Sequence, residues 1–329
     1  MNGAGDRLKA AAARFAAQWQ ALAPEGPVGL AVSGGADSLA LMLLMQEVAP
    51  RNFRVATVDH GLRPESAGEA AMVGAHCARL GIAHQTLKVS LTKGAAIQER
   101  ARAARYGALG GWCEREGLAA LVTAHHADDQ AETMVMRLNR GAGLRGLAAM
   151  RAVAPVPGVG GHRSIRLPLI RPLLSWRRAE LAGLVQAAGL VAVDDPSNRD
   201  PRHERVRIRD AMTSAALFDC NGMAASAAHL ADADAALEWM ADRLWAEVAA
   251  ETDAGQAIEL ACPVDLPTAL CLRLLERVLA RFGAPPPRGA ELARWRTAMA
   301  AGGVATLGGV KGDARRGIWR FTRAPAHRR

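Results

Sequence analysis

The sequence has few cysteines, few aromatic residues and no long hydrophobic run. Its five cysteines include no Cys-x-x-Cys pair, which argues against a zinc site, an iron–sulfur cluster or a disulfide framework and favours a reducing compartment. The apolar run at 39–45 is far shorter than the ~20 residues that cross a bilayer. Charges at Asp6, Arg7 and Lys9 are unlike a secretory signal. We therefore expect a cytoplasmic protein without a membrane contact.

Lysine is also scarce, although the chain is strongly basic. Only four of the 41 basic residues are lysine, and the formal net charge is +9. Such a charge often indicates contact with a polyanion such as nucleic acid, but an arginine-rich codon bias gives the same balance. Half of the 329 residues are apolar, which is enough for a buried core and is typical of about two domains.

Strand-like and helix-like segments alternate over the first 140 residues. Short apolar segments predict four strands, each followed by a helical segment, at 27–33, 53–59, 82–89 and 118–125. This alternation predicts an α/β fold, with a doubly wound, mostly parallel sheet and helices on both faces. Ligands of such sheets bind beyond the carboxyl ends of the strands.

The composition changes near residue 215. Beyond this point the chain is rich in alanine and helix-like, and a short hairpin is expected at its end, with 304–310 pairing with 317–322. We predict a catalytic domain over 1–215. A smaller, mainly helical domain over 216–329, with a basic tail, is expected to bind nucleic acid. Trp239, Trp245 and Trp295 are expected to pack between helices.

A glycine-rich turn joins the first predicted strand to a helix. It reads Ser33-Gly34-Gly35-Ala36-Asp37-Ser38. The glycines let backbone amides approach a phosphate, and the helix N-terminus favours an anion. The absence of Gly-Lys-Ser/Thr excludes the usual nucleoside-triphosphatase loop. Asp37 is expected to hold a Mg²⁺ ion on the phosphates, or else only to supply a negative charge to the helix start.

Three carboxylates follow the fourth predicted strand within one helical turn, namely Asp128, Asp129 and Glu132. Like charges this close repel one another and need a cation, which could be a metal ion or the ammonium group of an amino acid. The same residues could equally form a solvated acidic first turn. His125 and His126 precede them and could contact phosphate or transfer a proton.

Further motifs accompany the loop and the acidic turn. The loop resembles the SGGxDS pyrophosphate loop of the N-type ATP pyrophosphatases. The order and spacing of all motifs resemble the tRNA(Ile)-lysidine synthetase family over about residues 27–210. Besides the loop, the matching segments are DHGLRPES at 59–66, TAHHADDQAET at 123–133, RGAGLRGL at 140–147, RPLL at 171–174 and DPSN at 195–198.

This resemblance implies a two-step ligation. ATP adenylates the C2 oxygen of the wobble cytidine in an isoleucine tRNA with a CAU anticodon, and pyrophosphate leaves. The ε-amine of free L-lysine then attacks C2 and expels AMP. The product is lysidine, which pairs with adenine and converts AUG decoding to AUA decoding. The implied cofactors are ATP and Mg²⁺, and the sequence leaves a homodimer open.

The resemblance also assigns roles to residues. The loop from Ser33 to Ser38 would bind ATP, with Asp37 as the metal ligand. Lysine would be bound by Asp128, Asp129 and Glu132. Arg105 matches an arginine that the family uses beside the reacting phosphate, where a guanidinium neutralises developing charge. The implied catalytic residues are Asp37, Arg105, Asp129 and Glu132, and the expected tRNA-binding residues are Arg205, Arg207 and Arg209.

Two positions depart from the family pattern. Val206 stands where asparagine is expected after an arginine, and Ala149 stands where glycine is expected. Three alternatives remain: a tRNA thiolase, another ATP pyrophosphatase with the same loop, and a catalytically silent tRNA-binding protein. A thiolase commonly needs paired cysteines, which this sequence does not contain.

Overall fold

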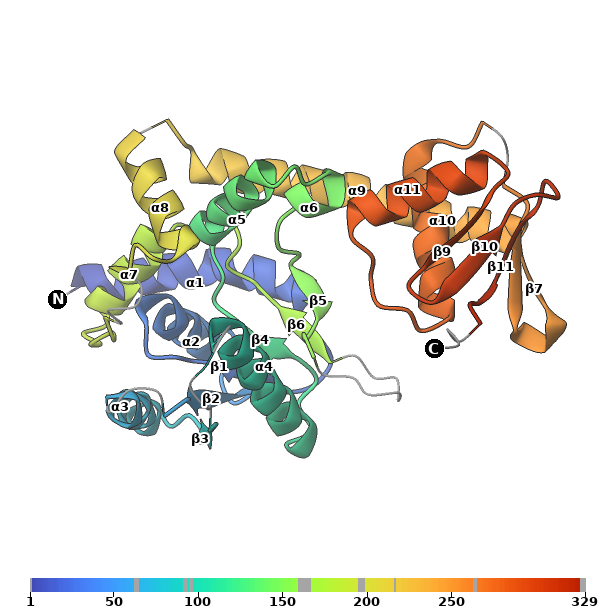
Figure 1. The fold of residues 1–329 in the computed structure, drawn as a ribbon. Helices are drawn as coiled ribbons and strands as arrows, with labels where there is room; N and C mark the ends of the chain where they lie inside the picture. Colours follow the sequence, from blue (N-terminus) through green and yellow to red (C-terminus); the bar gives the residue numbers. More distant parts are fainter. Residues whose placement is uncertain are drawn as a thin grey trace. The chain divides into compact units, whose positions relative to one another are not determined.

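Two compact units make up the chain. The computed structural model describes residues 2–61, 65–90, 94, 97–158, 167–194, 199–215, 217–262 and 265–325. The units are Met1–Ala231 and Asp232–Arg329 (Figure 1). They divide inside helix α9 (Cys220–Val248), whereas the composition changes before this helix. The functional division at residue 215 therefore stays a prediction. The motif residues 62–64 and 195–198 lie outside the described residues.

A six-stranded sheet organises the first unit. Its order is β3-β2-β1-β4-β6-β5, and every neighbouring pair is parallel except β5 with β6. The strands are β1 (Val28–Ala31), β2 (Phe53–Asp59), β3 (His84–Lys88), β4 (Leu121–Val122), β5 (Val153–Pro155) and β6 (Pro168–Ile170). The predicted mostly parallel α/β sheet is confirmed.

Helices pack on both faces of this sheet (Figure 1). Successive strand residues alternate between the faces, so that Val55 and Val122 join one apolar cluster and Ala56 and Leu121 join the other. The first cluster contains residues of α1 and α2, and the second contains residues of α4. The helices of this unit before α9 are α1 (Asn2–Leu22), α2 (Ala36–Val48), α3 (Ser66–Arg79), α4 (Ile97–Arg115), α5 (Ala127–Asn139), α6 (Leu144–Leu147), α7 (Arg178–Ala187) and α8 (Glu204–Ala215).

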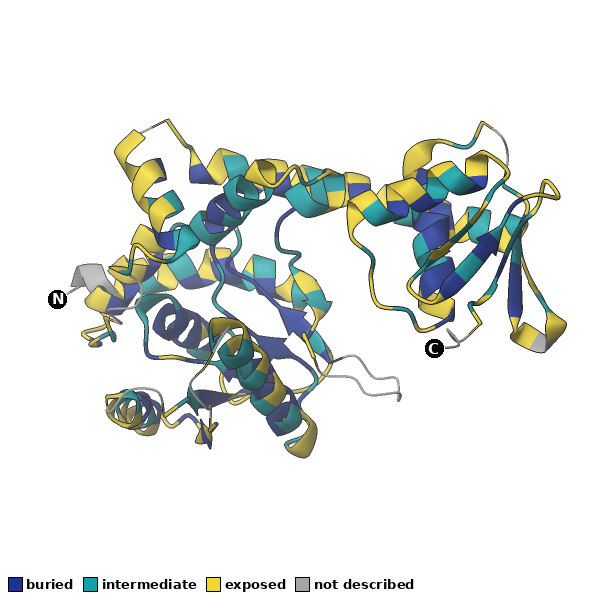
Figure 2. Cartoon of the chain, in the orientation of Figure 1, coloured by how far each residue is buried: buried dark blue, intermediate teal, exposed yellow. Residues whose placement is uncertain are grey.

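Two features of the sequence are explained by this core. The apolar run in α2 is buried on all sides, because the helix packs between the sheet, α1 and α7. Gly29 lies in β1 where α4 crosses it. A Cβ atom at this position would lie 2.4 Å from the Trp112 ring, so only glycine allows this close packing. Figure 2 shows the sheet and the helix faces toward it as the buried part of the unit.

The second unit combines helices with an antiparallel sheet. Helices α10 (Thr268–Arg281) and α11 (Gly289–Ala300) share an apolar cluster with the strands. Trp295 is buried in this cluster as predicted, whereas Trp239 is 57% exposed and carries the Arg243 guanidinium over its ring, so its predicted packing role is wrong. The strand order is β7-β8-β11-β10-β9, with β7 (Ala249–Thr252), β8 (Ala257–Leu260), β9 (Val304–Leu307), β10 (Val310–Asp313) and β11 (Trp319–Arg323).

The predicted terminal hairpin is wrong in its pairing. The chain turns at Gly308 and Gly309, whose φ angles of 56° and 78° suit glycine, so β9 pairs with β10. Strand β10 then pairs with β11. Strands β7 and β8 complete a sheet that the alanine-rich composition did not predict. None of the helices in the described parts of either unit is long and apolar enough to span a bilayer.

Candidate active site

The glycine-rich loop lies at the carboxyl end of β1. Ser38 Oγ donates to the Gly35 carbonyl at 2.9 Å and accepts from the Ser33 amide at 3.2 Å, which fixes the turn. Gly34 has a φ of 87°, and a Cβ atom there would lie 2.9 Å from the Val193 side chain. Gly35 is the N-cap of α2 and has no side chain that could cap the helix, so the first amides of α2 are open to an anion.

Asp37 presents a carboxylate oxygen with no partner. Its Oδ1 is buried without a hydrogen bond, and its Oδ2 lies 3.4 Å from Nε2 of His126. An unpaired carboxylate oxygen at a phosphate loop fits a Mg²⁺ ligand. The described residues contain no group of three or more His, Cys, Asp or Glu that could hold a metal by itself. Phosphate oxygens and water would therefore have to complete the shell.

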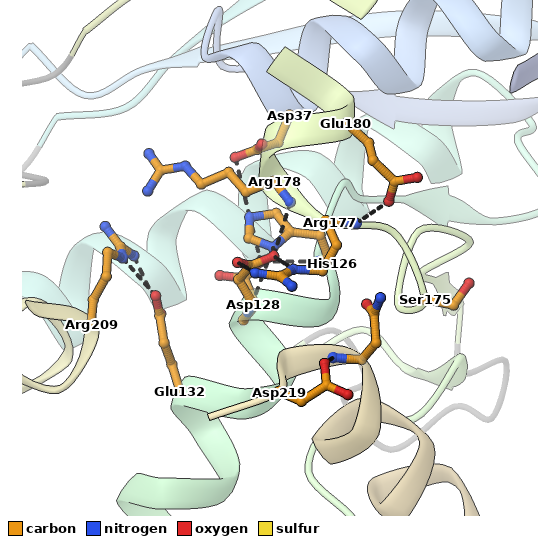
Figure 3. Close-up of polar contacts among 12 residues, drawn as sticks. Asp37, His126, Asp128, Glu132, Ser175, Arg177, Arg178, Glu180, Arg209 and Asp219 are labelled. Carbon is orange, nitrogen blue, oxygen red and sulfur yellow. Dashed lines mark hydrogen bonds and ion pairs between the residues drawn. The ribbon is translucent and has the colours of Figure 1, made fainter. Parts of the chain in front are cut away.

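His126 connects the loop to the acidic turn. It is the N-cap of α5 and is 3% exposed. Its ring nitrogens lie 3.4 Å from Asp37, 3.6 Å from Asp128 and 3.5 Å from Asp129. Burial lowers the pKa of His126, but the hydrogen bond to Asp37 and the three negative charges outweigh it and raise this pKa overall. Figure 3 shows the imidazole between Asp37 and Asp128.

Each of the three predicted carboxylates has a basic partner. Asp128 accepts two hydrogen bonds from Arg177, at 3.1 and 3.2 Å, and one from the Arg178 amide at 2.9 Å. These bonds lower the pKa of Asp128, although burial opposes them. Asp129 accepts from the His126 amide at 3.1 Å and lies 3.3 Å from Arg205. Burial raises the pKa of Asp129, but the positive charges of His126 and Arg205 outweigh burial, so the pKa is lowered overall.

Glu132 is the most enclosed of the three. It is 2% exposed, and its two oxygens accept from Nε of Arg205 and Nε of Arg209, each at 2.6 Å. Two of the arginines predicted to bind tRNA thus lie against α5, as Figure 3 shows for Arg209. Arg207, the third, is exposed on α8 and donates to the carbonyls of Pro201 and Arg202.

The remaining predicted residues lie at the same edge of the sheet. Arg105 on α4 is half-buried. Burial lowers the pKa of both His60 and His125, and the positive charge of Arg105 lowers each of them as well. These histidines follow β2 and β4, which places Arg105 beside the ends of both strands. Burial is the largest cause that lowers the pKa of His125. The charge of Asp129 raises this pKa, but the charges of Arg171, Arg105 and Arg205 lower it. The pKa is about 3, so the ring is neutral near pH 7.

The sequence did not predict two parts of this site. The bridging position of His126 depends on Asp37 and Asp128, which come from different helices. Arg171 belongs to the segment RPLL at 171–174, to which the sequence assigns no role beyond its match to the family. Its side chain is buried directly after β6. Ala149, where the family pattern has glycine, has a φ of 49°, which is a left-handed conformation that glycine adopts without strain.

The loop and the sheet define the class of protein. Residues 8–216 match the family described as the PP-loop domain. A U34-tRNA thiolase from Methanococcus maripaludis with its 4Fe-4S cluster has a similar fold, with a TM-score of 0.53 at 16% identity, over 68% of this chain and 78% of that chain. The chain is thus a PP-loop protein.

Curated relatives narrow the class to one family. A tRNA(Ile)-lysidine synthase of Novosphingobium aromaticivorans is 62% identical over 328 residues, which cover 100% of this chain and 98% of the relative. Another from Zymomonas mobilis is 37% identical over 306 residues, covering 92% and 90%. The chain belongs to the tRNA(Ile)-lysidine synthase family, and the resemblance noted in the motifs is confirmed.

Proposed function

We propose that this chain ligates L-lysine to C2 of the wobble cytidine in isoleucine tRNA with a CAU anticodon, at the expense of ATP. Full-length membership of the family supports the reaction. The observation that carries the assignment of the site is the path of polar contacts from Asp37 of the loop, through His126, to Asp129. Mg²⁺ and a cytoplasmic location belong to the same proposal, and the homodimer stays a prediction.

The adenylation step would use the loop and Arg105. The amides at the start of α2, with Ser33 and Ser38, would bind the phosphates of ATP. Asp37 would hold Mg²⁺, which supplies positive charge to the phosphate oxygens when it is bound. The C2 oxygen of cytidine attacks the α-phosphorus, and the bond to pyrophosphate breaks. Arg105 has no carboxylate partner among the described residues, so its charge is available for the reacting phosphate.

The ligation step needs a cation site for lysine. We place the lysine ammonium at Asp129, because its contact with an arginine side chain, 3.3 Å to Arg205, is longer than those that Asp128 and Glu132 make with their arginines. Asp128 and Glu132 would each have to release an arginine before they could bind lysine. An amine with a pKa of ~10.4 must lose a proton to react, and its acidity rises as the new C–N bond forms. Asp129, or Glu132 after such an exchange, would accept that proton.

The tRNA-binding role of α8 is also part of the proposal. Arg207 is exposed and can reach a phosphodiester directly. Arg205 and Arg209 would act on tRNA only by leaving Glu132, and in the present arrangement they neutralise that carboxylate. A thiolase finds no support, since the cysteines of the described residues form no cluster that could hold a metal.

Nucleoside mass analysis tests the proposed function. The purified chain is incubated with ATP, Mg²⁺, lysine and a transcript of isoleucine tRNA with a CAU anticodon. Lysidine in place of the wobble cytidine, with release of pyrophosphate, is the expected result. Methionine tRNA, which shares the anticodon, serves as the control substrate. A sulfur-containing nucleoside would favour a thiolase, and tRNA binding with no product would favour a silent binding protein.

A further inference from the structure

The start of α5, which carries the acidic turn, is held from outside by the segment 175–178. The Trp176 carbonyl accepts from the first amide of α5 at 2.8 Å. The Arg177 guanidinium donates twice to the Asp128 carboxylate, at 3.1 and 3.2 Å, and the Arg178 amide donates to it at 2.9 Å. Figure 3 shows both arginines beside Asp128. Residues 175–178, here called the anchor segment, thus fix the first two residues of the helix.

Helix α1 holds the anchor segment in turn. Gln18 uses both ends of its side-chain amide, since Oε1 accepts from the Trp176 indole at 2.6 Å and Nε2 donates to the Ser175 hydroxyl at 2.7 Å. One turn earlier, Arg14 donates to the Ser175 carbonyl at 2.8 Å, and its guanidinium carbon lies 4.1 Å from the centre of the Trp176 ring. Two side chains of α1 therefore fix two consecutive residues of the anchor segment.

Glu180 joins α1 to the anchor segment a second time. Its carboxylate accepts from Nη1 of Arg14 at 2.8 Å and from the Arg177 amide at 2.7 Å. The side chains of Arg14 and Glu180 are each 43% exposed, so this pair contributes little by itself. Gln18 contributes more, because Trp176 is 2% exposed and its indole N–H would be left buried without a partner.

We propose that Gln18 and Arg14 are positioning residues for the lysine-binding part of the site. They act through the anchor segment, which fixes the start of α5. This inference rests on the proposed function, which places the lysine ammonium at Asp129, the third residue of that helix. A misplacement of about 1 Å can cost on the order of a hundredfold in rate, so such support matters. Both residues precede the motifs, which begin at Ser33, so the sequence assigns them no role.

The loop assigned to ATP is held by contacts of its own. Ser38 donates to the Gly35 carbonyl and accepts from the Ser33 amide, and neither bond involves α1. Loss of the Gln18 amide should therefore weaken the use of lysine more than the use of ATP. A purely structural role would not produce this difference, because a general loosening of the unit affects both substrates.

Steady-state formation of lysidine, with lysine and ATP varied in turn, measures this difference. Gln18→Ala removes both hydrogen bonds, and Gln20→Ala, at an exposed position on the same helix, is the matched control. We expect Gln18→Ala to raise the KM for lysine on the order of tenfold, which is the worth of about one net hydrogen bond. Its KM for ATP should change much less, and Gln20→Ala should leave both values unchanged.

Gln18→Glu separates the hydrogen bonds from the mere presence of a side chain. The carboxylate accepts from the Trp176 indole as the amide did, and it also accepts from the Ser175 hydroxyl once that hydroxyl turns to donate. Its charge lies one turn from Arg14, which compensates for it. This variant should therefore restore most of the apparent affinity for lysine that Gln18→Ala loses.

Hydrogen exchange tests the anchoring without any reaction. In Gln18→Ala the amides at the start of α5 should exchange faster, because this turn opens more easily, whereas those of residues 33–38 should keep their rate. Gln20→Ala should alter neither segment. Arg14→Ala should change the exchange and the KM for lysine in the same direction but less. It decides the matter if Gln18→Ala does not fold, since the Arg14 side chain is 43% exposed.

Three results would overturn the proposal. One is a folded Gln18→Ala variant with the original KM for lysine. Another is a rise of the KM for ATP by the same factor as that for lysine, which would indicate a general structural role. The third is unchanged exchange at the start of α5, which would exclude the route through the anchor segment. If the original chain makes no lysidine, the proposed function fails, while the exchange comparison still decides whether α1 positions α5.

Discussion

Replacing Glu132 with glutamine would leave two arginines facing a neutral side chain. The carboxylate is 2% exposed and accepts from Arg205 and Arg209, each at 2.6 Å. Removing one partner of a fully buried ion pair costs ~3–5 kcal/mol. The arginine side chains are 36% and 27% exposed and remain partly solvated, so the cost is smaller. We expect a loss of about 2 kcal/mol, because glutamine keeps one acceptor and water reaches the arginines.

Thermal unfolding measures this loss. For the unit Met1–Ala231, which contains Glu132, about 2 kcal/mol corresponds to a fall of roughly 4–8 °C in melting temperature. Glu204→Gln is the matched control. Glu204 lies on α8, the helix that carries Arg205 and Arg209, and it pairs with Arg140 on the surface, where the two side chains are 37% and 62% exposed. Its removal should cost less than about 0.5 kcal/mol.

The same variant tests the chemistry of Glu132. If the carboxylate mainly anchors α8 to α5, Glu132→Gln should impair both adenylation and lysine use, whereas Asp129→Asn should raise the KM for lysine more than it slows pyrophosphate release. An unchanged melting temperature for Glu132→Gln, with a defect confined to lysine, would refute the anchoring argument. The carboxylate would then be a lysine ligand whose arginine contacts are readily exchanged.

Three further predictions follow from single residues. Ala149→Gly should stabilise the chain by roughly 0.5 kcal/mol, because relief of the left-handed strain exceeds the entropy cost, whereas Ala148→Gly, at a φ of −61°, should destabilise it in urea titrations. Asp37→Ala should abolish pyrophosphate release while tRNA binding persists in a gel-shift assay, and normal turnover would disprove the assigned role. The pKa of His125 is lowered to about 3, so the unfolded chain binds more protons below its ordinary pKa of 6.5. The free energy of unfolding should therefore be unaffected by His125 above pH 6.5 and should fall toward pH 5, by at most about 1.4 kcal/mol per pH unit. If His125→Gln shows the same dependence of the free energy of unfolding on pH, His125 is not its origin.

Local patterns in the sequence predicted the loop, the parallel sheet and the helices. The run Leu39–Met45 and the glycines at 34 and 35 depend on neighbours in the chain, so spacing was enough to interpret them. The pairing of Arg205 and Arg209 with Glu132 could not be read in this way, since more than 70 residues separate them. The sequence alone therefore predicts tRNA binding for these arginines and not their contact with Glu132.

The C-terminal sheet was missed for a different reason. Ala249–Thr252 continues directly from α9 and shares its alanine-rich composition, so nothing local marks the start of a strand. Residues 249–252 form a strand because β7 pairs with β8, which in turn pairs with β11. Tertiary pairing thus outweighed intrinsic preference in this unit.

A missing side chain in the centre of the sheet sets the position of distant charges. Trp112 can rest on β1 only because Gly29 has no Cβ atom, and the helix that carries Trp112 also carries Arg105 and Tyr106. One added methyl group at Gly29 would push this helix outward as a rigid rod, and both side chains would be displaced from the strand ends. The activity of a Gly29→Ala variant would therefore show how accurately Arg105 must be placed for the reaction.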